Sequence, residues 1–402
     1  MTDPKAFDDP EIHDFLLKHE NSDLTALVLS GKSVADIPVA EIVAQIRSRK
    51  KAKQKLPRWY QTKGIVFPPP VSIEQASSEE TATYKAELIT DSDAAMLDLT
   101  GGMGVDSSYF ARSVKKITYV ERQAFLVECF RHNCAKMAIE NCAWIAGDGV
   151  GYLAEVATDQ YDVIYLDPAR RDNYQNKVIA LDQCEPDVSV LHPLLLEKSR
   201  SVIIKLSPML DISHTISALS CVREVHVVAV ENECKELLFV LERGFDKAPT
   251  IHTVNLQKPE DQRFSFLQEE ERNANAKIGS SGSYLYEPNA AILKSGAFKV
   301  VAQQLQLSKL HEHTHLYISD SSVKGFPGKV YHIEKQYPAS KKMIKTNLGT
   351  LSVSIKSRNY PESAESIRKK YRLKDGSDRY VFFTTAKSAE KEQKVVYECK
   401  KV

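Results

Sequence analysis

A glycine-rich segment with an acidic first residue, Asp98-Leu-Thr-Gly-Gly-Met-Gly104, lies between an apolar run at 96–100 and a helix expected at 107–113. Its glycines allow the backbone to approach a ligand at the carboxyl end of a strand. Glu121 ends the next apolar run, where a carboxylate can accept both hydroxyl groups of a ribose. A tight turn without a ligand is the alternative. The expected contacts of a nucleoside-containing cofactor, which fit NAD as well as S-adenosylmethionine (SAM), are Asp98, Thr100, Gly101, Gly102, Gly104 and Glu121.

A second motif, Asp167-Pro168-Ala169-Arg170, follows the apolar run at 162–167. Methyltransferases that act on base nitrogens carry an Asp/Asn-Pro-Pro-aromatic or related tetrad at this place. Its first side chain and the proline carbonyl accept hydrogen bonds from the nitrogen, so that the lone pair faces the methyl group. The motif therefore favours SAM over NAD and predicts Asp167, Pro168 and Arg170 as catalytic residues. Because no aromatic residue follows Ala169, the motif disfavours adenine N6 chemistry and leaves the acceptor open.

Further candidate site residues lie at or near the ends of the neighbouring apolar runs. Asp148 could reach the adenine edge of the cofactor or could cap the next helix. Arg170 and Arg171 could hold a substrate phosphate, since a guanidinium binds two oxygens at once, although Arg171 could instead pair with Asp172 on the surface. Lys205 is expected on the substrate side.

A candidate lid precedes the first strand. Ser78, Thr81 and Lys85 share one face if the segment is helical. We expect Thr81 and Lys85 to contact SAM.

The pattern that positions these residues alternates short β-rich runs with helix-length segments, which is typical of a parallel α/β sheet. The last two runs are separated only by Glu231 to Lys235, too short for a crossover helix, and should form an antiparallel hairpin. We therefore predict a Rossmann-like, seven-stranded methyltransferase core. Its strands are expected at 96–100, 117–121, 143–147, 162–167, 201–207, 224–230 and 236–242.

The flanking segments predict further α and α+β domains. Residues 10–55 have helical spacing and precede the linker Phe67-Pro-Pro-Pro70. Beyond the core we expect a polar stretch at 246–283, one helix at 289–309 and a strand at 315–318. The last segment should contain strands near 329–334, 349–355 and 379–385 and a basic helix near 361–373. The expected domains are 1–66, 67–245, 246–323 and 324–402.

Composition indicates a cytoplasmic chain. The 402 residues are 43% hydrophobic, and none of their runs approaches the roughly 20 apolar residues of a membrane span. The seven cysteines contain no C-x-x-C pair, so we expect reduced thiols. The oligomeric state stays open.

Two segments are basic although the net charge is +1. Residues 341–402 contain 16 Lys and Arg against 7 Asp and Glu, a balance of +9. The basic positions from 47 to 58 are either a solvated helix face or a phosphate-binding patch flanked by Trp59 and Tyr60.

His311-Glu-His-Thr-His315 places three imidazoles at alternate positions, which is a conceivable metal spacing. Without a carboxylate or cysteine cluster nearby, we favour a helix end followed by a strand and expect no metal.

Together these segments resemble a known family, the class I SAM methyltransferases of Bacteroidetes that carry a THUMP-like domain. The resemblance covers nearly the whole chain and implies a helical N-terminal part, a methyltransferase core, a ferredoxin-like insert and a C-terminal THUMP-like domain. It also implies RNA, as rRNA or tRNA, as the substrate. The supporting segments are 56–59, 74–85, 98–106, 167–171, 286–289 and 314–317.

The leading hypothesis is thus a SAM-dependent methyltransferase that modifies a base of structured RNA. One alternative retains SAM but assigns a protein or small-molecule substrate. Another is a non-catalytic RNA-binding module with a degenerate SAM pocket.

Overall fold

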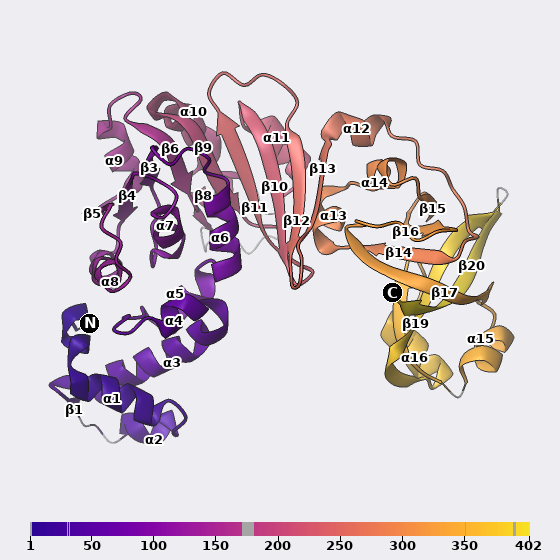
Figure 1. Ribbon diagram of the computed structural model, residues 1–402, viewed down its shortest axis with the longest axis horizontal. Coiled ribbons are helices and arrows are strands. Elements are labelled where there is room, and N and C mark those ends of the chain that lie inside the picture. The colour runs from indigo at the N-terminus through magenta and orange to yellow at the C-terminus, as the bar shows by residue number, and fades with distance from the viewer. Residues whose placement is uncertain (1, 30, 32, 171–180, 350, 389–390) are drawn as a thin grey trace. The chain divides into compact units, whose positions relative to one another are not determined.

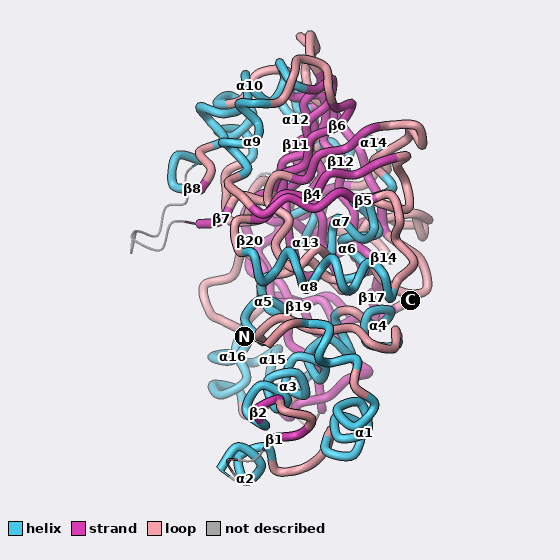
Figure 2. The backbone as a smooth tube through the Cα atoms, turned by 90° about the vertical axis from the view of Figure 1, so that its left-hand side faces the viewer, coloured by secondary structure: helices cyan, strands magenta, loops and turns pink. Residues whose placement is uncertain are grey.

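Five of the apolar runs form the parallel part of a sheet in the computed structural model (Figure 1). The strands are hydrogen-bonded in the order β9-β6-β3-β4-β5. Successive strands are connected by helices. Figure 2 colours the helices cyan and the strands magenta. The strands are β3 (Ala95–Asp98), β4 (Lys116–Glu121), β5 (Cys142–Ala146), β6 (Tyr161–Leu166) and β9 (Ser199–Leu206), and the helices are α7 (Val105–Phe110), α8 (Ala124–Lys136), α9 (Gly149–Glu155) and α10 (Val188–Lys198).

The structure describes residues 2–29, 31, 33–170, 181–349, 351–388 and 391–402. It divides into two compact units. The first contains Met1–Arg223 and Leu238–Lys247, and the second contains Glu224–Leu237 and Ala248–Val402. None of the helices in the described part has the length and apolar character that crossing a bilayer requires.

The expected hairpin is β10 (Val222–Val230) and β11 (Glu233–Glu242), which are neighbours in the sheet. Glu231 and Asn232 form the turn with φ values of 47° and 66°. Positive φ at both central residues is what a two-residue hairpin turn of the I′ type requires. The Rossmann-like α/β core with seven strands is confirmed.

Two further strands extend this sheet, and here the predicted polar stretch at 246–283 was wrong. β12 (Thr250–Leu256) pairs in parallel with β10, and β13 (Gln262–Leu267) pairs antiparallel with β12. The sheet therefore has nine strands in the order β13-β12-β10-β11-β9-β6-β3-β4-β5. The two added strands mix polar and apolar residues, so their apolar pattern is weak.

The N-terminal segment is helical, as expected, and its longest helix is α3 (Val39–Lys55). The proline linker beside it is ordered by side chains of α3. Gln45 donates to the Phe67 carbonyl and accepts from the Phe67 N–H, and Ser48 donates to the Pro68 carbonyl. The other elements are η1 (Pro4–Asp8), α1 (Pro10–His19), α2 (Leu24–Leu29), β1 (Ser33–Val34), β2 (Ile37–Pro38), α4 (Pro57–Gln61), α5 (Pro70–Gln75) and α6 (Glu79–Glu87).

The helix predicted at 289–309 is two short helices, α13 (Ala290–Ser295) and α14 (Val300–Gln304). Gly296 ends α13 in the left-handed conformation, with φ of 78°, which interrupts the helical pattern. The histidine segment is a hairpin of β15 (Ser308–His311) and β16 (Thr314–Ser319), so the predicted helix end there was also wrong.

The second unit contains a seven-stranded sheet in the order β15-β16-β14-β17-β20-β19-β18. The strands and helix expected after residue 324 are present, but β20 and α15 were missed. The remaining elements of the second unit are α12 (Gln268–Asn273), β14 (Tyr284–Pro288), β17 (Gly328–Pro338), α15 (Lys341–Leu348), β18 (Ser352–Arg358), α16 (Ala364–Tyr371), β19 (Lys374–Ser388) and β20 (Lys391–Lys401). Those of the first unit are β7 (Ala169–Arg170), η2 (Leu181–Gln183), β8 (Cys184–Glu185) and α11 (Ile212–Ala218).

Candidate active site

The glycine-rich loop wraps around the carboxylate of Asp98 at the end of β3. One oxygen of Asp98 accepts from the Thr100 N–H at 3.0 Å, and the other accepts from the Ser107 hydroxyl at 2.5 Å. Burial raises the pKa of Asp98 to about 7, and the hydrogen bonds from Ser107 and Thr100 oppose that rise. The loop therefore surrounds a buried carboxyl group that titrates near neutral pH.

Two glycines of the loop are required by packing. A Cβ at Gly101 would lie 2.0 Å from the Tyr119 ring, and a Cβ at Gly104 would lie 2.1 Å from the Phe130 ring. Gly104 also has φ of 84° at the start of α7, a conformation that side chains disfavour. These glycines let the loop pack closely against β4 and α8, and this packing requires them whether or not a ligand binds.

Glu121 at the end of β4 is held by two backbone donors. Its carboxylate accepts from the Gly102 N–H at 2.9 Å and from the Gln123 N–H at 2.8 Å. Since β3 and β4 are parallel neighbours, Asp98 and Glu121 stand at the same sheet edge. The structure thus brings the two predicted cofactor carboxylates together, while the ribose contact of Glu121 stays a prediction.

The Asp167 motif is connected to the glycine-rich loop. The Asp167 N–H donates to the Thr100 hydroxyl at 2.6 Å, and the Lys205 ammonium forms an ion pair with the Asp167 carboxylate. β6 pairs with both β3 and β9, so three neighbouring strands supply these residues. Thr100, predicted as a cofactor contact, also positions the Asp167 backbone, which the sequence pattern did not reveal.

A second carboxylate beside the site was missed. Asp106 in α7 lies 3.2 Å from the Lys85 ammonium and accepts from the hydroxyls of Ser77 and Tyr165, each at 2.8 Å. Burial would raise the pKa of Asp106, but the ammonium groups of Lys85 and Lys205 outweigh burial and lower it. An acidic residue in the first turn after the glycine-rich loop was the signal that could have revealed it.

The candidate lid is helix α6, which contacts α7. Lys85 is buried and also donates to the Ser77 hydroxyl at 3.0 Å. Thr81 is buried, and its hydroxyl donates to the Ser78 carbonyl at 3.3 Å. These contacts are internal to the protein, and SAM binding by Thr81 and Lys85 stays a prediction.

Asp148 caps α9 by accepting from the Gly151 N–H at 2.7 Å, which is one of the two predicted roles. The turn before α9 lies against the end of β3, because a Cβ at Gly149 would lie 2.3 Å from the Leu99 carbonyl oxygen. An adenine contact by Asp148 stays a prediction.

Arg170 and Arg171 are the residues predicted to hold a substrate phosphate. The backbone of Arg170 in β7 pairs with Cys184 in β8. Arg171 lies outside the described residues, so its phosphate contact stays a prediction.

One of the two interpretations of the basic run at 47–58, a phosphate-binding patch flanked by Trp59 and Tyr60, needs a correction. Trp59 is fully buried and so cannot flank a nucleic-acid surface. The Tyr60 ring instead makes cation–π contacts within the protein. The Arg49 guanidinium lies 4.9 Å and the Lys53 ammonium 5.5 Å from its centroid. Lys55 donates to two carbonyls of α5. Several cations of this run therefore have partners within the protein.

The three imidazoles of the histidine segment do not converge on one position for a metal ion in the described structure. His311 bonds the Glu392 carboxylate at 2.7 Å, while His315 stacks on Phe298 with centroids 3.6 Å apart. Burial, together with Lys309 and His313, lowers the pKa of His315 to about 4.

A different group, Glu224, His226 and His252, has ligand-type atoms within 4.8 Å of one another. Its two imidazoles stack at 4.7 Å with planes 19° apart, so one ring would have to turn before both nitrogens faced one ion.

The sheet order, the hairpin, the glycine-rich loop and the acidic residues at successive strand ends define a Rossmann-like methyltransferase fold. Family models match a ferredoxin-like domain at residues 284–327 and a THUMP domain-like segment at 328–401. The crystal structure of a "putative methyltransferase" from Porphyromonas gingivalis W83 has 32% identity and a TM-score of 0.89, and the match covers 100% of this chain and 99% of that chain. The chain belongs to the family of this Porphyromonas protein, a Bacteroidetes methyltransferase family with ferredoxin-like and THUMP-like domains.

More distant similarities are confined to parts of the chain. A "putative class I S-adenosylmethionine-dependent methyltransferase" from Listeria monocytogenes has 10% identity and a TM-score of 0.36, with 62% of this chain and 94% of that chain covered. A "putative methyltransferase" from Streptococcus mutans, in complex with SAH, has 14% identity and a TM-score of 0.30, with 40% and 96% covered. No curated protein sequence matches the chain.

Proposed function

We propose that this protein transfers a methyl group from SAM to a base of structured RNA, either rRNA or tRNA. The observation that carries the proposal is the connection of Thr100, Asp167 and Lys205. It joins the candidate cofactor loop to the candidate catalytic carboxylate at one edge of the sheet. Ligands of open α/β sheets bind at this carboxyl edge.

SAM supplies an electrophilic methyl group on a sulfonium, so the protein mainly has to position the acceptor. Asp98, the loop glycines and Glu121 would hold the cofactor. Asp167 and the Pro168 carbonyl would accept hydrogen bonds from the acceptor nitrogen. Lys205 positions the Asp167 carboxylate through the ion pair.

RNA is supported by the C-terminal part of the chain. The THUMP-like match covers residues 328–401, and THUMP-type domains accompany RNA-modifying enzymes in the family that the sequence resembles. The +9 balance of residues 341–402 suits phosphate contacts. We also propose that residues 67–245 perform the chemistry in the cytoplasm, while residues 246–323 and 324–402 bind the substrate.

The test is transfer of labelled methyl groups from SAM into total RNA of a strain that lacks this protein. Asp167→Ala should reduce transfer at least 100-fold, which corresponds to roughly 2.7 kcal/mol of transition-state stabilisation. A matched control is Asp159→Ala, which removes an exposed aspartate paired with Arg243 before the start of β6. Equal activity of the two variants, or label that enters protein instead of RNA, would contradict the proposal.

A further inference from the structure

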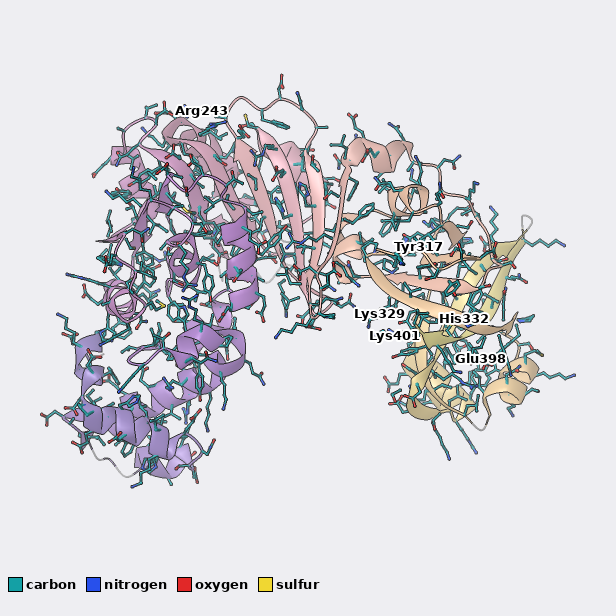
Figure 3. The ribbon with its side chains drawn as sticks, viewed as in Figure 1. Arg243, Tyr317, Lys329, His332, Glu398 and Lys401 are labelled. Carbon is teal, nitrogen blue, oxygen red and sulfur yellow. The ribbon has the colours of Figure 1, made fainter. Side chains whose placement is uncertain are left out.

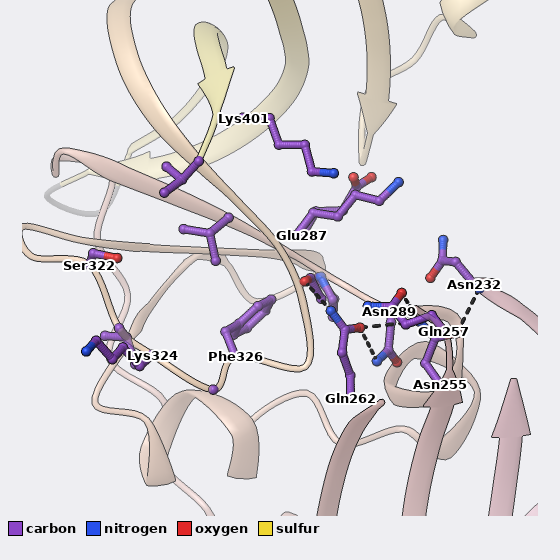
Figure 4. Close-up of a pocket in the computed structure, with 17 residues that line it drawn as sticks. Asn232, Asn255, Gln257, Gln262, Glu287, Asn289, Ser322, Lys324, Phe326 and Lys401 are labelled. Carbon is purple, nitrogen blue, oxygen red and sulfur yellow. Dashed lines mark hydrogen bonds between the residues drawn. The ribbon is translucent and has the colours of Figure 1, made fainter. Parts of the chain in front are cut away.

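The second unit contains a cavity of about 380 Å³ that the sequence did not predict. Its volume lies within the range of roughly 300–1,000 Å³ that is usual for ligand sites. Five amide side chains from four segments gather on one side of it (Figure 4). They are Asn232, Asn255, Gln257, Gln262 and Asn289.

Hydrogen bonds between the amides fix this wall. Asn255 donates to Gln257 at 2.8 Å and to Gln262 at 3.3 Å. Asn289 donates to Gln262 at 3.0 Å, and Gln262 donates to the Gly328 carbonyl at 2.7 Å. Because Asn255 and Asn289 are buried, the lattice is held from within the protein. Amides offer both donors and acceptors, as the edge of a nucleobase does.

Three lysines from different segments complete the lining. Lys324 lies in the loop after β16, Lys329 in β17 and Lys401 in β20, and Figure 3 labels the last two close together. Each is exposed, and within the described part of the chain none of them forms an ion pair. Neighbouring lysines such as Lys356 and Lys400 are ion-paired. None of these three lysines therefore has its charge paired with a carboxylate in an ion pair of the described structure.

Glu287 supplies the acidic side chain among the lining residues, and its charge is already balanced. It lies 3.2 Å from the Lys356 ammonium and 2.8 Å from the Arg358 guanidinium, and it accepts from the Tyr331 hydroxyl. It consequently leaves the three lysines available for an anion.

We propose that this cavity binds a phosphorylated nucleotide, with its phosphate at the lysines and its base against the amide wall. The nucleotide is either one unit of an RNA chain or a free molecule. The RNA form rests on the proposed function, to which it adds a second contact distant in sequence from Asp167.

The experiment compares two variants of the full chain that each lose three lysine charges. One is Lys324→Gln/Lys329→Gln/Lys401→Gln. The matched control changes three lysines of the first unit that are also exposed and unpaired within the described residues, Lys5, Lys18 and Lys116. Binding of a labelled 12-nucleotide RNA and of nucleoside monophosphates is measured without SAM, over a series of salt concentrations. Thermal unfolding verifies that both variants fold.

We expect the cavity variant to bind at least 10-fold more weakly than the control. Its salt slope should fall by about 0.7, since that is the contribution of one neutralised phosphate on a single strand. Competition by monophosphates would assign a free nucleotide, and RNA binding without competition would assign an RNA unit. Equal weakening of the two variants, or no binding by the wild type, would overturn the proposal. The assay measures binding and not methyl transfer. Its outcome therefore does not depend on whether the proposed methyl transfer is correct.

Discussion

Each of the two units buries a carboxylate among cations, but they neutralise it differently. In the first unit Asp106, with 12% of its side chain exposed, pairs with Lys85, which has no exposed surface. In the second unit Glu287 is 7% exposed, while its partners Lys356 and Arg358 are 24% and 44% exposed. Water therefore reaches the cations of the pair in the second unit, but it does not reach the Lys85 ammonium in the first.

This difference indicates how rigidly each region is held. A fully buried ion pair must keep its geometry, since either charge alone is costly in a low dielectric. A pair with exposed members can exchange protein contacts for water at small cost. The candidate active site thus has an internally fixed frame, whereas the neighbourhood of the cavity can accommodate a change of charge.

The largest expected effect comes from Lys85→Met. The variant removes the ammonium that lies 3.2 Å from the Asp106 carboxylate, so the free energy of unfolding should fall by about 3–5 kcal/mol. Chemical denaturation measures it. The control Lys115→Met removes an exposed lysine 3.9 Å from Asp93 and should change stability by less than about 0.5 kcal/mol. A loss at Lys85 no larger than the control would show that the buried pair does not organise this unit.

A pair of glycines compares the packing of the two units. Gly104 and Gly296 have φ of 84° and 78°, but only the first meets a ring when a Cβ is added. Gly296→Ala should cost about 1–2 kcal/mol for its backbone conformation. Gly104→Ala should cost about 2–4 kcal/mol, because the Phe130 ring must also move. Equal losses in denaturation would mean that the ring adapts freely.

Asp98 is a buried carboxyl group, and the pH dependence of stability tests how far burial raises its pKa. Its folded pKa of about 7 lies above the ordinary value of 3.8, so the folded state holds the proton more tightly. The associated stability is complete below about pH 4 and is lost as the pH rises towards 7. Relative to Asp98→Asn, the wild type should lose about 2–3 kcal/mol between pH 5 and 7. A difference that does not vary with pH would place the Asp98 pKa near its ordinary value.

The smallest effect is expected for Glu287→Gln. Gln can still accept from the Tyr331 hydroxyl, and water can solvate Lys356 and Arg358. The free energy of unfolding should fall by only about 1–2 kcal/mol in the same denaturation assay. A loss as large as that of Lys85→Met would remove the contrast between the units.

Much of the first unit was predictable because its pattern is local. Each strand is a short apolar run, and polar residues at the strand ends must share one edge of a parallel sheet. Asp98, Glu121 and Asp167 were therefore assigned to the same edge before their contacts were known. The roles of Thr100 and Asp106 were not visible, because each depends on a partner on another element.

The second unit was predicted less well. β12 and β13 were assigned to a polar stretch, and the break at Gly296 was read as part of one helix. In the first unit, one of the two interpretations of the basic run at 47–58 put Trp59 beside a phosphate-binding surface, although Trp59 is buried. A basic run does not indicate which way a neighbouring ring points. Patterns that are short or mixed carry little periodicity, and their structure depends on what packs against them.

Local patterns in the sequence were enough to predict the parallel core, the glycine-rich loop and the order of acidic residues along successive strands, since strand period and turn chemistry act over a few residues. Which of these groups meet depends on the tertiary structure. It joined Thr100 to Asp167, enclosed Lys85 with Asp106, and assembled one cavity from residues as far apart as Asn232 and Lys401. Contacts between distant segments depend on how the whole chain packs, so no local pattern contains them.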